Sequence, residues 1–234
     1  MTDYILRGFS DGTDFFRPVS TRSNIHMISP RGFGDMICTL SNLLAEPDST
    51  SRLLLPYINA GYLEWSRLCN ITEKLERLDV NLPLYNRYVS MSYDNVSLAN
   101  ASGLQVLDNY PKSEYIQIDK RRLSEYSIPK HKYITYQYSG HSKRCGYTNK
   151  IIDDILSTYS GYEYVDVGGK EGLGLSKIGY AIEHADIHVG IDSGMTHFAY
   201  CIKKPKDVHV YIPSDKQTGV AKRWIKMGFD VRLI

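Results

Sequence analysis

Residues 175–197 read LSKIGYAIEHADIHVGIDSGMTH. Apolar positions return every three or four residues over Ser176–His184, which is the spacing of an amphipathic helix. The run Ile187–Ile191 is rich in β-branched residues and predicts a buried strand. A turn around Gly194 separates this strand from a second helical pattern over Met195–Ile202. A helix, a strand, a tight turn and another helix therefore follow one another, as in α/β proteins.

The same alternation extends over the second half of the chain. Outward from Ile187–Ile191, we expect strands at Tyr133–Tyr138, Tyr162–Val167, Val208–Ile212 and Val231–Ile234. Further helices are expected at Thr148–Ser157 and Thr218–Met227. Five strands separated by four helices predict one Rossmann-like domain with a largely parallel sheet.

The first half of the chain repeats the pattern less regularly. A strand at Asn24–Ile28, a glycine loop at Ser29–Asp35 and a helix at Met36–Ala45 form its first unit. The other expected elements are a strand at Arg52–Leu55, helices at Gly61–Leu68 and Thr72–Leu78, a strand at Tyr88–Ser92 and a loop from Tyr93 to Tyr115. We place a domain boundary within Asp119–Lys132. The sequence thus predicts two Rossmann-like halves, residues 1–125 and 126–234, that face each other across a cleft.

Composition favours a folded, water-soluble chain. Of 234 residues, 42% are hydrophobic and 23% are charged, with a formal net charge of +2. No apolar run approaches the roughly 20 residues that span a bilayer, and the acidic start is unlike a signal peptide. The cysteines are scattered without a C-x-x-C pair, which excludes the common zinc ribbons. We therefore expect a cytoplasmic protein (in the host cytoplasm if viral) without membrane insertion.

Ligands of open α/β sheets bind beyond the carboxyl ends of the strands, so the turns after the strands are the candidate sites. The turn Asp192-Ser193-Gly194-Met195-Thr196-His197 follows one strand and opens a helix. Backbone amides of Ser193, Gly194 and Met195 at a helix N-terminus favour an anion, and Gly194 allows a phosphate to approach closely. His197 lies one turn further on and can donate to a diphosphate oxygen. Asp192 can cap the helix or orient the loop.

Two other turns carry charged residues. Lys143 and Arg144 follow the strand Tyr133–Tyr138 and can neutralise a departing diphosphate. Gly32 and Gly34 follow the strand Asn24–Ile28, and Asp35 beside them offers a carboxylate for general-base catalysis.

Motifs of other nucleotide-binding and metal-binding classes are missing. The third glycine of a dinucleotide fingerprint is replaced by Ile37, which disfavours an NAD oxidoreductase, and no Walker loop occurs. No Asp-x-Asp spacing is available to hold a divalent ion against a diphosphate. His184, Asp186 and His188 straddle a helix-to-strand boundary and need not share a face, so we expect no metal site there.

Together the three turns resemble the heptosyltransferase-like glycosyltransferases of family 9, which have the GT-B fold. The matching motifs are Gly34-Asp35, Lys143-Arg144 and Asp192-Ser193-Gly194-x-x-His197, and Leu175–Asp186 is similar to the helix before the last motif. The resemblance covers most of Tyr133–Pro213 and a shorter piece around Asn24–Leu44. The chain is much shorter than usual for that fold, and Cys145 stands where the family has an aromatic residue.

The resemblance implies a metal-independent, inverting glycosyltransferase with a compact GT-B fold and no cofactor besides its nucleotide-sugar substrate. Residues 126–234 would bind the nucleotide sugar, and residues 1–125 would form the acceptor side. The implied diphosphate contacts are Lys143, Arg144, Ser193, Gly194, Met195 and His197, the implied base is Asp35, and Gly32, Gly34 and Asp192 orient their loops.

The acceptor and one rival function stay open. The family implies a glycan acceptor of the lipopolysaccharide type, yet the sequence shows no membrane anchor. Clustered basic residues and 19 tyrosines favour a hydroxymethylated pyrimidine in DNA, as in phage-type DNA-modifying glycosyltransferases, with candidate stacking residues Phe33, Tyr57, Tyr62 and Trp65. The rival is a non-catalytic nucleotide-sugar-binding module, which would need the diphosphate turn but not Asp35.

Overall fold

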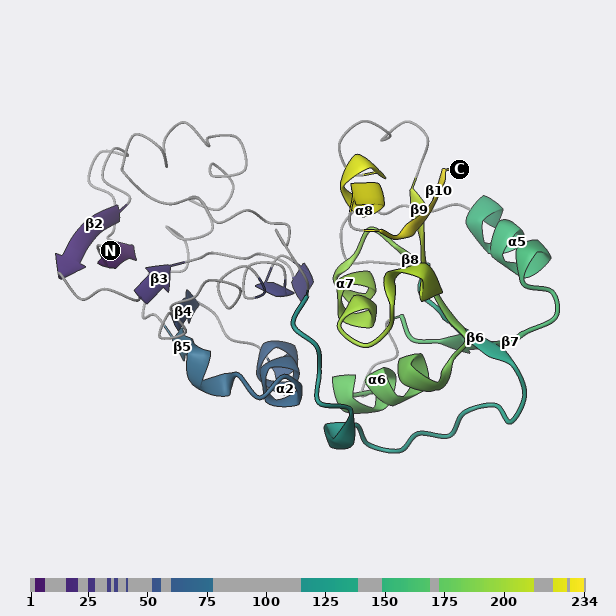
Figure 1. Cartoon of the computed structure of the whole chain (residues 1–234), viewed down its shortest axis with the longest axis horizontal. Coiled ribbons are helices and arrows are strands. Elements are labelled where there is room, and N and C mark those ends of the chain that lie inside the picture. Colours follow the sequence, from purple (N-terminus) through teal and green to yellow (C-terminus); the bar gives the residue numbers. More distant parts are fainter. Residues whose placement is uncertain are drawn as a thin grey trace. The chain divides into compact units, whose positions relative to one another are not determined.

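A computed structural model of the chain divides it into two compact units. Unit 1 comprises Met1–Arg67 and Ile71–Ile116, and unit 2 comprises Leu68–Asn70 and Gln117–Ile234. Figure 1 shows the helices and strands of each unit. The structure describes residues 3–6, 16–20, 25–27, 33–34, 36–37, 41, 52–55, 60–77, 115–138, 149–168, 173–212, 221–226 and 228–233.

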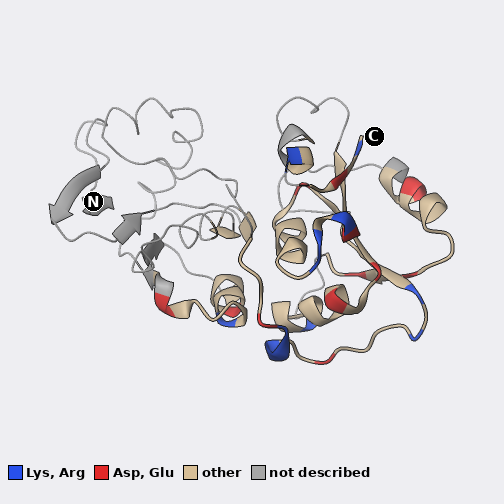
Figure 2. Cartoon of the chain, in the orientation of Figure 1, with Lys and Arg blue, Asp and Glu red and all other residues tan. Residues whose placement is uncertain are grey.

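Unit 2 includes a short piece of chain from far upstream. The amide of Asp119 donates to the carbonyl of Leu68 at 2.8 Å, and Arg122 Nη2 donates to Asn70 Oδ1 at 2.9 Å. Arg122 belongs to the 3-10 turn η2 (Lys120–Arg122), the basic turn that is blue in Figure 2. These bonds hold Leu68–Asn70 to unit 2. The expected division at 125/126 remains a prediction.

The sheet of unit 2 is parallel and five-stranded, in the order β10-β9-β8-β6-β7. Its strands are β6 (Tyr133–Tyr136), β7 (Glu163–Asp166), β8 (Ile187–Ile191), β9 (Val208–Ile212) and β10 (Asp230–Leu233). The parallel α/β sheet expected from the sequence is therefore confirmed. Strands β8 and β9 have the predicted bounds, and the other three differ by a residue or two at their ends.

Helices connect successive strands of this sheet. They are α5 (Asn149–Thr158), α6 (Leu175–His184), α7 (Gly194–Tyr200), α8 (Lys222–Lys226) and the 3-10 turn η4 (Pro205–Asp207). Side chains of a strand alternate between the two faces of a sheet. Ile134 and Val189 face α5, whereas Tyr133 on the other face donates to the α6 carbonyl of Ala181 at 2.8 Å. The sheet is therefore covered by helices on both faces.

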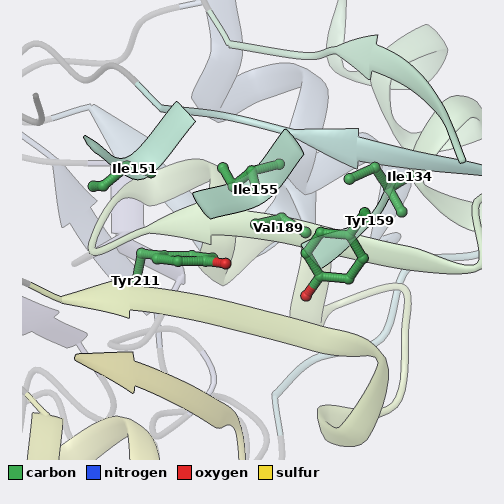
Figure 3. Packing of buried hydrophobic residues seen from close by; sticks show 6 residues of the cluster. All are labelled: Ile134, Ile151, Ile155, Tyr159, Val189 and Tyr211. Carbon is green, nitrogen blue, oxygen red and sulfur yellow. The ribbon is translucent and has the colours of Figure 1, made fainter. Parts of the chain in front are cut away.

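The core on the α5 side holds the sheet and this helix together. Three side chains from α5 and the turn after it meet three from the strands, as Figure 3 shows: Ile151, Ile155, Tyr159, Ile134, Val189 and Tyr211. All six are at most 4% exposed. Burying a side chain of this size contributes about 1.5–3 kcal/mol, so the cluster is a main source of the stability of unit 2.

The order of the strands reverses at β6. The chain runs from β6 outward to β7, then returns across β6 to β8 and continues to β9 and β10. The connections that leave β6 and β8 therefore diverge from neighbouring carboxyl ends. In open α/β sheets, this reversal is the place where ligands bind.

Unit 1 contains a smaller parallel sheet in the order β3-β4-β5. It consists of β3 (Ile25–Met27), β4 (Arg52–Leu55) and β5 (Leu75–Arg77), and α2 (Ala60–Leu68) connects β4 to the 3-10 turn η1 (Thr72–Lys74). The predicted strands at Asn24–Ile28 and Arg52–Leu55 and the helix at Gly61–Leu68 are confirmed. Strands β1 (Asp3–Leu6) and β2 (Phe16–Ser20) pair in antiparallel fashion and were not expected.

The prediction of a helix at Thr72–Leu78 is wrong. Only the 3-10 turn η1 forms there, and Leu75–Arg77 continues as β5, with Leu75 opposite Leu53 of β4. The apolar spacing of so short a stretch fits either structure, and pairing with β4 supplies its backbone with hydrogen bonds that a single turn lacks. The strand expected at Tyr88–Ser92 lies outside the described residues. Among the described helices, none has the length and apolar character needed to cross a bilayer.

The contact between β8 and α7 leaves no room for a side chain at Gly190. A Cβ atom there would overlap Thr196 Oγ1 and lie 3.1 Å from His188 Nε2. Thr196 is fully buried, and its hydroxyl donates to the carbonyl of Ile191 at 2.5 Å, so it cannot move aside. The replacement Gly190→Ala is therefore expected to lower the free energy of unfolding by about 1–3 kcal/mol, measured by urea denaturation.

The matched control is Gly161→Ala, because a Cβ atom at Gly161 meets nothing within 4 Å. This variant should unfold at the wild-type urea concentration or slightly above it. Equal midpoints for the two variants would contradict the tight contact between β8 and α7.

Candidate functional site

The turn after β8 is tied to the end of β6 by side chains. Ser193 Oγ donates to Gln137 Oε1 at 2.5 Å, although the two residues are 56 positions apart in the sequence. Gln137 directly follows β6, and Ser193 lies two residues after β8. This hydrogen bond therefore spans the point at which the strand order reverses.

Gln137 is itself fixed from two sides. Its backbone amide donates to the carbonyl of Val189 at 2.9 Å, which extends the β6–β8 pairing by one residue. On the β7 side, a Cβ atom at Gly168 would lie 2.7 Å from Gln137 Cγ, and the amide of Gly168 donates to Asp166 Oδ1 at 2.8 Å. The ends of three adjacent strands are thus packed against one another through Gln137.

Ser193 occupies the N-cap position of α7 without capping it. Its backbone is extended (φ −151°, ψ 164°), and its side chain makes no hydrogen bond to the first turn of the helix. The first amides of an α-helix have no acceptor within the helix. The Ser193 hydroxyl, which would ordinarily accept a hydrogen bond from these amides, is bound to Gln137. The half-buried residues Gly194 and Met195 can therefore present their amides to an anion.

His197 lies in the first turns of α7 and is almost completely buried. Its side chain is 7% exposed, and its ring lies 4.4 Å from the Trp224 ring of α8, tilted by 36°. Burial lowers the pKa of His197 to about 3, so the ring is neutral at physiological pH. A neutral imidazole can donate one N–H hydrogen bond but brings no positive charge. Positive charge for a diphosphate must come from other residues.

Asp192 accepts a hydrogen bond from a second helix. Trp224 Nε1 donates to Asp192 Oδ1 at 3.0 Å, and the indole of Trp224 is fully buried with Phe229 packed edge-on at 4.6 Å. The N-cap position falls on Ser193 rather than on Asp192. Asp192 thus connects the turn after β8 to α8, and its loop-orienting role remains a prediction.

The sequence did not point to Trp224 or Gln137. A signal was present for Trp224, because a tryptophan within the predicted helix Thr218–Met227 needs an acceptor for its indole N–H once buried. No sequence signal was present for Gln137, because its partner Ser193 lies in a distant segment. Both residues hold the turn Asp192–His197 in place.

The predicted site residues fall into two groups. The structure brings Asp192, Ser193, Gly194, Met195 and His197 together in one turn at the carboxyl edge of unit 2. Gly34, in unit 1, is buried and, together with Phe33, helical, so the prediction of a loop over Ser29–Asp35 is wrong at these two residues. The other predicted residues lie outside the described residues: Gly32, Asp35, Lys143 and Arg144.

The histidines considered as metal ligands do not converge. His184 Nδ1 lies 2.9 Å from the carbonyl of Tyr180, whereas His188 is fully buried with its Nδ1 atom 3.0 Å from Thr135 Oγ1. Within the described ranges, no three His, Cys, Asp or Glu side chains are grouped to hold a metal ion. Absence of a metal from the reaction remains a prediction.

Comparison with known proteins gives matches among solved structures only. No protein-family model and no curated protein sequence matches the chain. The chain is similar to the bacterial iron-containing dodecameric glycosyltransferase TibC from enterotoxigenic E. coli H10407, with a TM-score of 0.49 and 12% identity over 84% of this chain and 60% of that chain. It is also similar to the dodecameric iron-containing heptosyltransferase TibC in complex with ADP-D-β-D-heptose, with a TM-score of 0.49 and 13% identity over 87% of this chain and 62% of that one. The chain spans about six tenths of the length of these proteins.

Two buried histidines make unit 2 sensitive to acid. Burial lowers the pKa values of His188 and His197 to about 3, whereas histidines of the unfolded chain titrate near 6.5. Between these values the unfolded chain binds protons that the folded chain does not. The free energy of unfolding is therefore fully retained above about pH 7 and falls below pH 6.5, by up to about 1.4 kcal/mol per pH unit for each histidine.

Urea denaturation at pH 7.5, 6.5 and 5.5 measures this dependence. The variant His197→Phe keeps an aromatic ring against Trp224 but cannot titrate, so its free energy of unfolding should fall less steeply below pH 6.5. Identical slopes for wild type and variant would show that His197 is not held neutral by burial.

Proposed function

We propose that the chain is a glycosyltransferase that binds a nucleotide-diphosphate sugar at the carboxyl edge of unit 2. One observation carries most weight. The turn Asp192-Ser193-Gly194-x-x-His197, which resembles the family motif, lies beside the reversal of strand order and is fixed there by the Ser193–Gln137 hydrogen bond. A parallel sheet offers its ligand site at this point, and an uncapped helix start suits a diphosphate.

In this proposal the diphosphate is held by donors of two kinds. Backbone amides of Ser193, Gly194 and Met195 and the neutral ring of His197 donate hydrogen bonds. Lys143 and Arg144 supply the positive charge that the buried, neutral His197 does not. Donors already in place stabilise charge as it develops on the departing diphosphate, which is how the enzyme lowers the barrier without a metal ion.

The transfer itself is a single displacement. Asp35 takes the proton of the acceptor hydroxyl while the hydroxyl oxygen attacks the anomeric carbon. The bond from this carbon to the diphosphate oxygen breaks, and its electron pair leaves with the nucleoside diphosphate. Attack from the side opposite the leaving group inverts the anomeric configuration. A general base such as Asp35 accounts for about 10²–10⁴-fold in rate.

One observation that favoured a DNA acceptor weakens in the structure. The cations of η2 form ion pairs, Lys120 with Glu183 at 2.8 Å and Arg121 with Asp119 at 2.9 Å, but both side chains stay largely exposed to a partner. Of the candidate stacking residues, Tyr62 and Trp65 are at most 4% exposed. Hydroxymethylated DNA and a glycan hydroxyl are therefore both acceptors to be tested. High salt should abolish activity on DNA but not on a glycan.

Binding of the donor is the first test. A thermal-shift panel with UDP, ADP, GDP, CDP and NAD should show one nucleoside diphosphate that stabilises the protein, by about 2.7 kcal/mol at a ligand concentration of 100 Kd. The variants His197→Ala and Lys143→Ala/Arg144→Ala should lose this stabilisation. Lys204→Ala, which removes an exposed cation before β9 at the opposite edge of the sheet, should keep it. Stabilisation by NAD alone, or by none of the ligands, refutes the proposal.

Catalysis is tested separately through Asp35. The variant Asp35→Asn should release nucleoside diphosphate from the donor sugar about 10²–10⁴ times more slowly, because an amide cannot accept the hydroxyl proton. Its affinity for the nucleoside diphosphate should stay at the wild-type value. Near-normal turnover would remove Asp35 from the mechanism, and a wild type that binds donor but transfers no sugar would favour the non-catalytic binding module.

A further inference from the structure

Three tyrosines form a column that runs to the carboxyl edge of unit 2. The Tyr164 ring of β7 meets the Tyr136 ring of β6 edge-on, with centroids 6.3 Å apart and an interplanar angle of 81°. The Tyr136 ring in turn stacks on Tyr138, with centroids 5.7 Å apart and an angle of 13°. We call Tyr164, Tyr136 and Tyr138 the tyrosine column.

The inner part of the column is held by the core. Tyr164 OH donates to the carbonyl of Tyr159 at 2.8 Å, at the end of α5. Tyr136 packs against the core cluster around Ile134, and burial raises the pKa of its hydroxyl. Because both rings are fixed, the outer face on which Tyr138 stacks has a defined orientation.

Tyr138 differs from the other two tyrosines in its position. It lies two residues beyond Tyr136, the last residue of β6, and its side chain is only half-buried. Among the residues that the structure describes, its ring contacts only the ring of Tyr136, and its hydroxyl has no hydrogen-bond partner. A flat aromatic ring is thus supported on one side at the edge of the sheet.

Tyr138 directly follows, in the chain, a residue that contacts the turn after β8. Gln137, its neighbour in the chain, accepts the hydrogen bond of Ser193. Successive side chains at a strand end point to opposite faces of the sheet, so Gln137 lies toward α7 and Tyr138 toward α5. A ligand that crosses the edge beside Gln137 meets the turn after β8 on one side and Tyr138 on the other.

We propose that the base of the bound nucleotide stacks on Tyr138, with its diphosphate at Ser193–Met195. This inference rests on the proposed function and adds to it a residue that binds the base. Every nucleobase has a flat aromatic face, and stacking on an aromatic side chain contributes to binding whichever base is present. Tyr138 therefore sets affinity for the nucleoside half of the donor, while selection among bases falls to other contacts.

The test compares ligands with and without a base. Isothermal titration measures binding of the nucleoside diphosphate that stabilises the wild type and, separately, of inorganic pyrophosphate. Tyr138→Leu keeps an apolar side chain but cannot stack. Its affinity for the nucleoside diphosphate should therefore be about 5- to 100-fold lower, and its affinity for pyrophosphate should be unchanged. Tyr138→Phe should bind both ligands within about twofold of the wild type, because its ring stacks equally well.

Tyr162→Leu is the matched control. Tyr162 is also a half-buried tyrosine of unit 2 with one ring contact to another tyrosine, at 6.1 Å from Tyr159, but it precedes β7 at the opposite edge. Its replacement should leave affinity for both ligands unchanged. Thermal melting of each variant checks that it is folded.

A second variant covers the case in which Tyr138→Leu fails to fold. Tyr138→Trp adds an indole at the same place, and its additional fluorescence should be quenched by the nucleoside diphosphate but not by pyrophosphate. Absence of that quenching overturns the proposal.

The remaining outcomes separate the two proposals. Unchanged affinity of Tyr138→Leu for a nucleoside diphosphate that the wild type binds overturns base stacking and leaves the glycosyltransferase proposal intact. An equal loss of affinity for the nucleoside diphosphate and for pyrophosphate also overturns base stacking, because the effect would then be a general distortion of the edge of the sheet. If the wild type binds none of the four nucleoside diphosphates, both proposals fall.

Discussion

The hydrogen bond between Ser193 and Gln137 is the constraint on which the edge of unit 2 depends. It connects neighbouring strands whose chain connections run in opposite directions, at a distance of 2.5 Å. Because the Ser193 hydroxyl is bound to Gln137, it does not cap α7. The first backbone amides of this helix therefore receive no hydrogen bond from the Ser193 side chain. This hydroxyl thus adds a side-chain link between two paired strand ends and leaves the first turn of α7 without a side-chain cap.

Several tight contacts surround this bond. Gly168 lies against Gln137, Gly190 lies against Thr196, and Trp224 holds Asp192 from α8. One of these contacts fixes Gln137 and the other two fix Thr196 and Asp192 of the turn, so the turn is held in place before any ligand arrives. Preorganised donors of this kind need no rearrangement as charge develops, which is why electrostatic stabilisation by a rigid backbone is effective.

Local pattern was enough to locate most strands of unit 2. The β-branched runs at Ile187–Ile191 and Val208–Ile212 match their strands residue by residue. Pattern failed at Leu75–Arg77, where pairing with β4 decides the structure and the sequence spacing is ambiguous. The antiparallel pair β1 and β2 was missed as well, since its short strands carry little alternation of their own.

The candidate site was predicted only in part, for a related reason. Asp192, Ser193, Gly194 and His197 are close in sequence, so one motif reveals them together. Gln137 and Trp224 reach the same turn from distant segments, and only the order and register of the strands bring them there. The burial of His197, which makes it a neutral donor, likewise depends on the packing of Trp224 and not on the motif.

The three-residue piece Leu68–Asn70 has a consequence for how the chain can be dissected. These residues belong to unit 2, although they lie far upstream of its other residues, which begin at Gln117. A fragment cut at Gln117 would deprive the Asp119 amide of its carbonyl acceptor and Arg122 of its partner Asn70. Unit 2 is therefore not one contiguous stretch of the chain. Truncation at a single point cannot yield the complete unit. A fragment that starts at Gln117 needs an added segment to replace Leu68–Asn70.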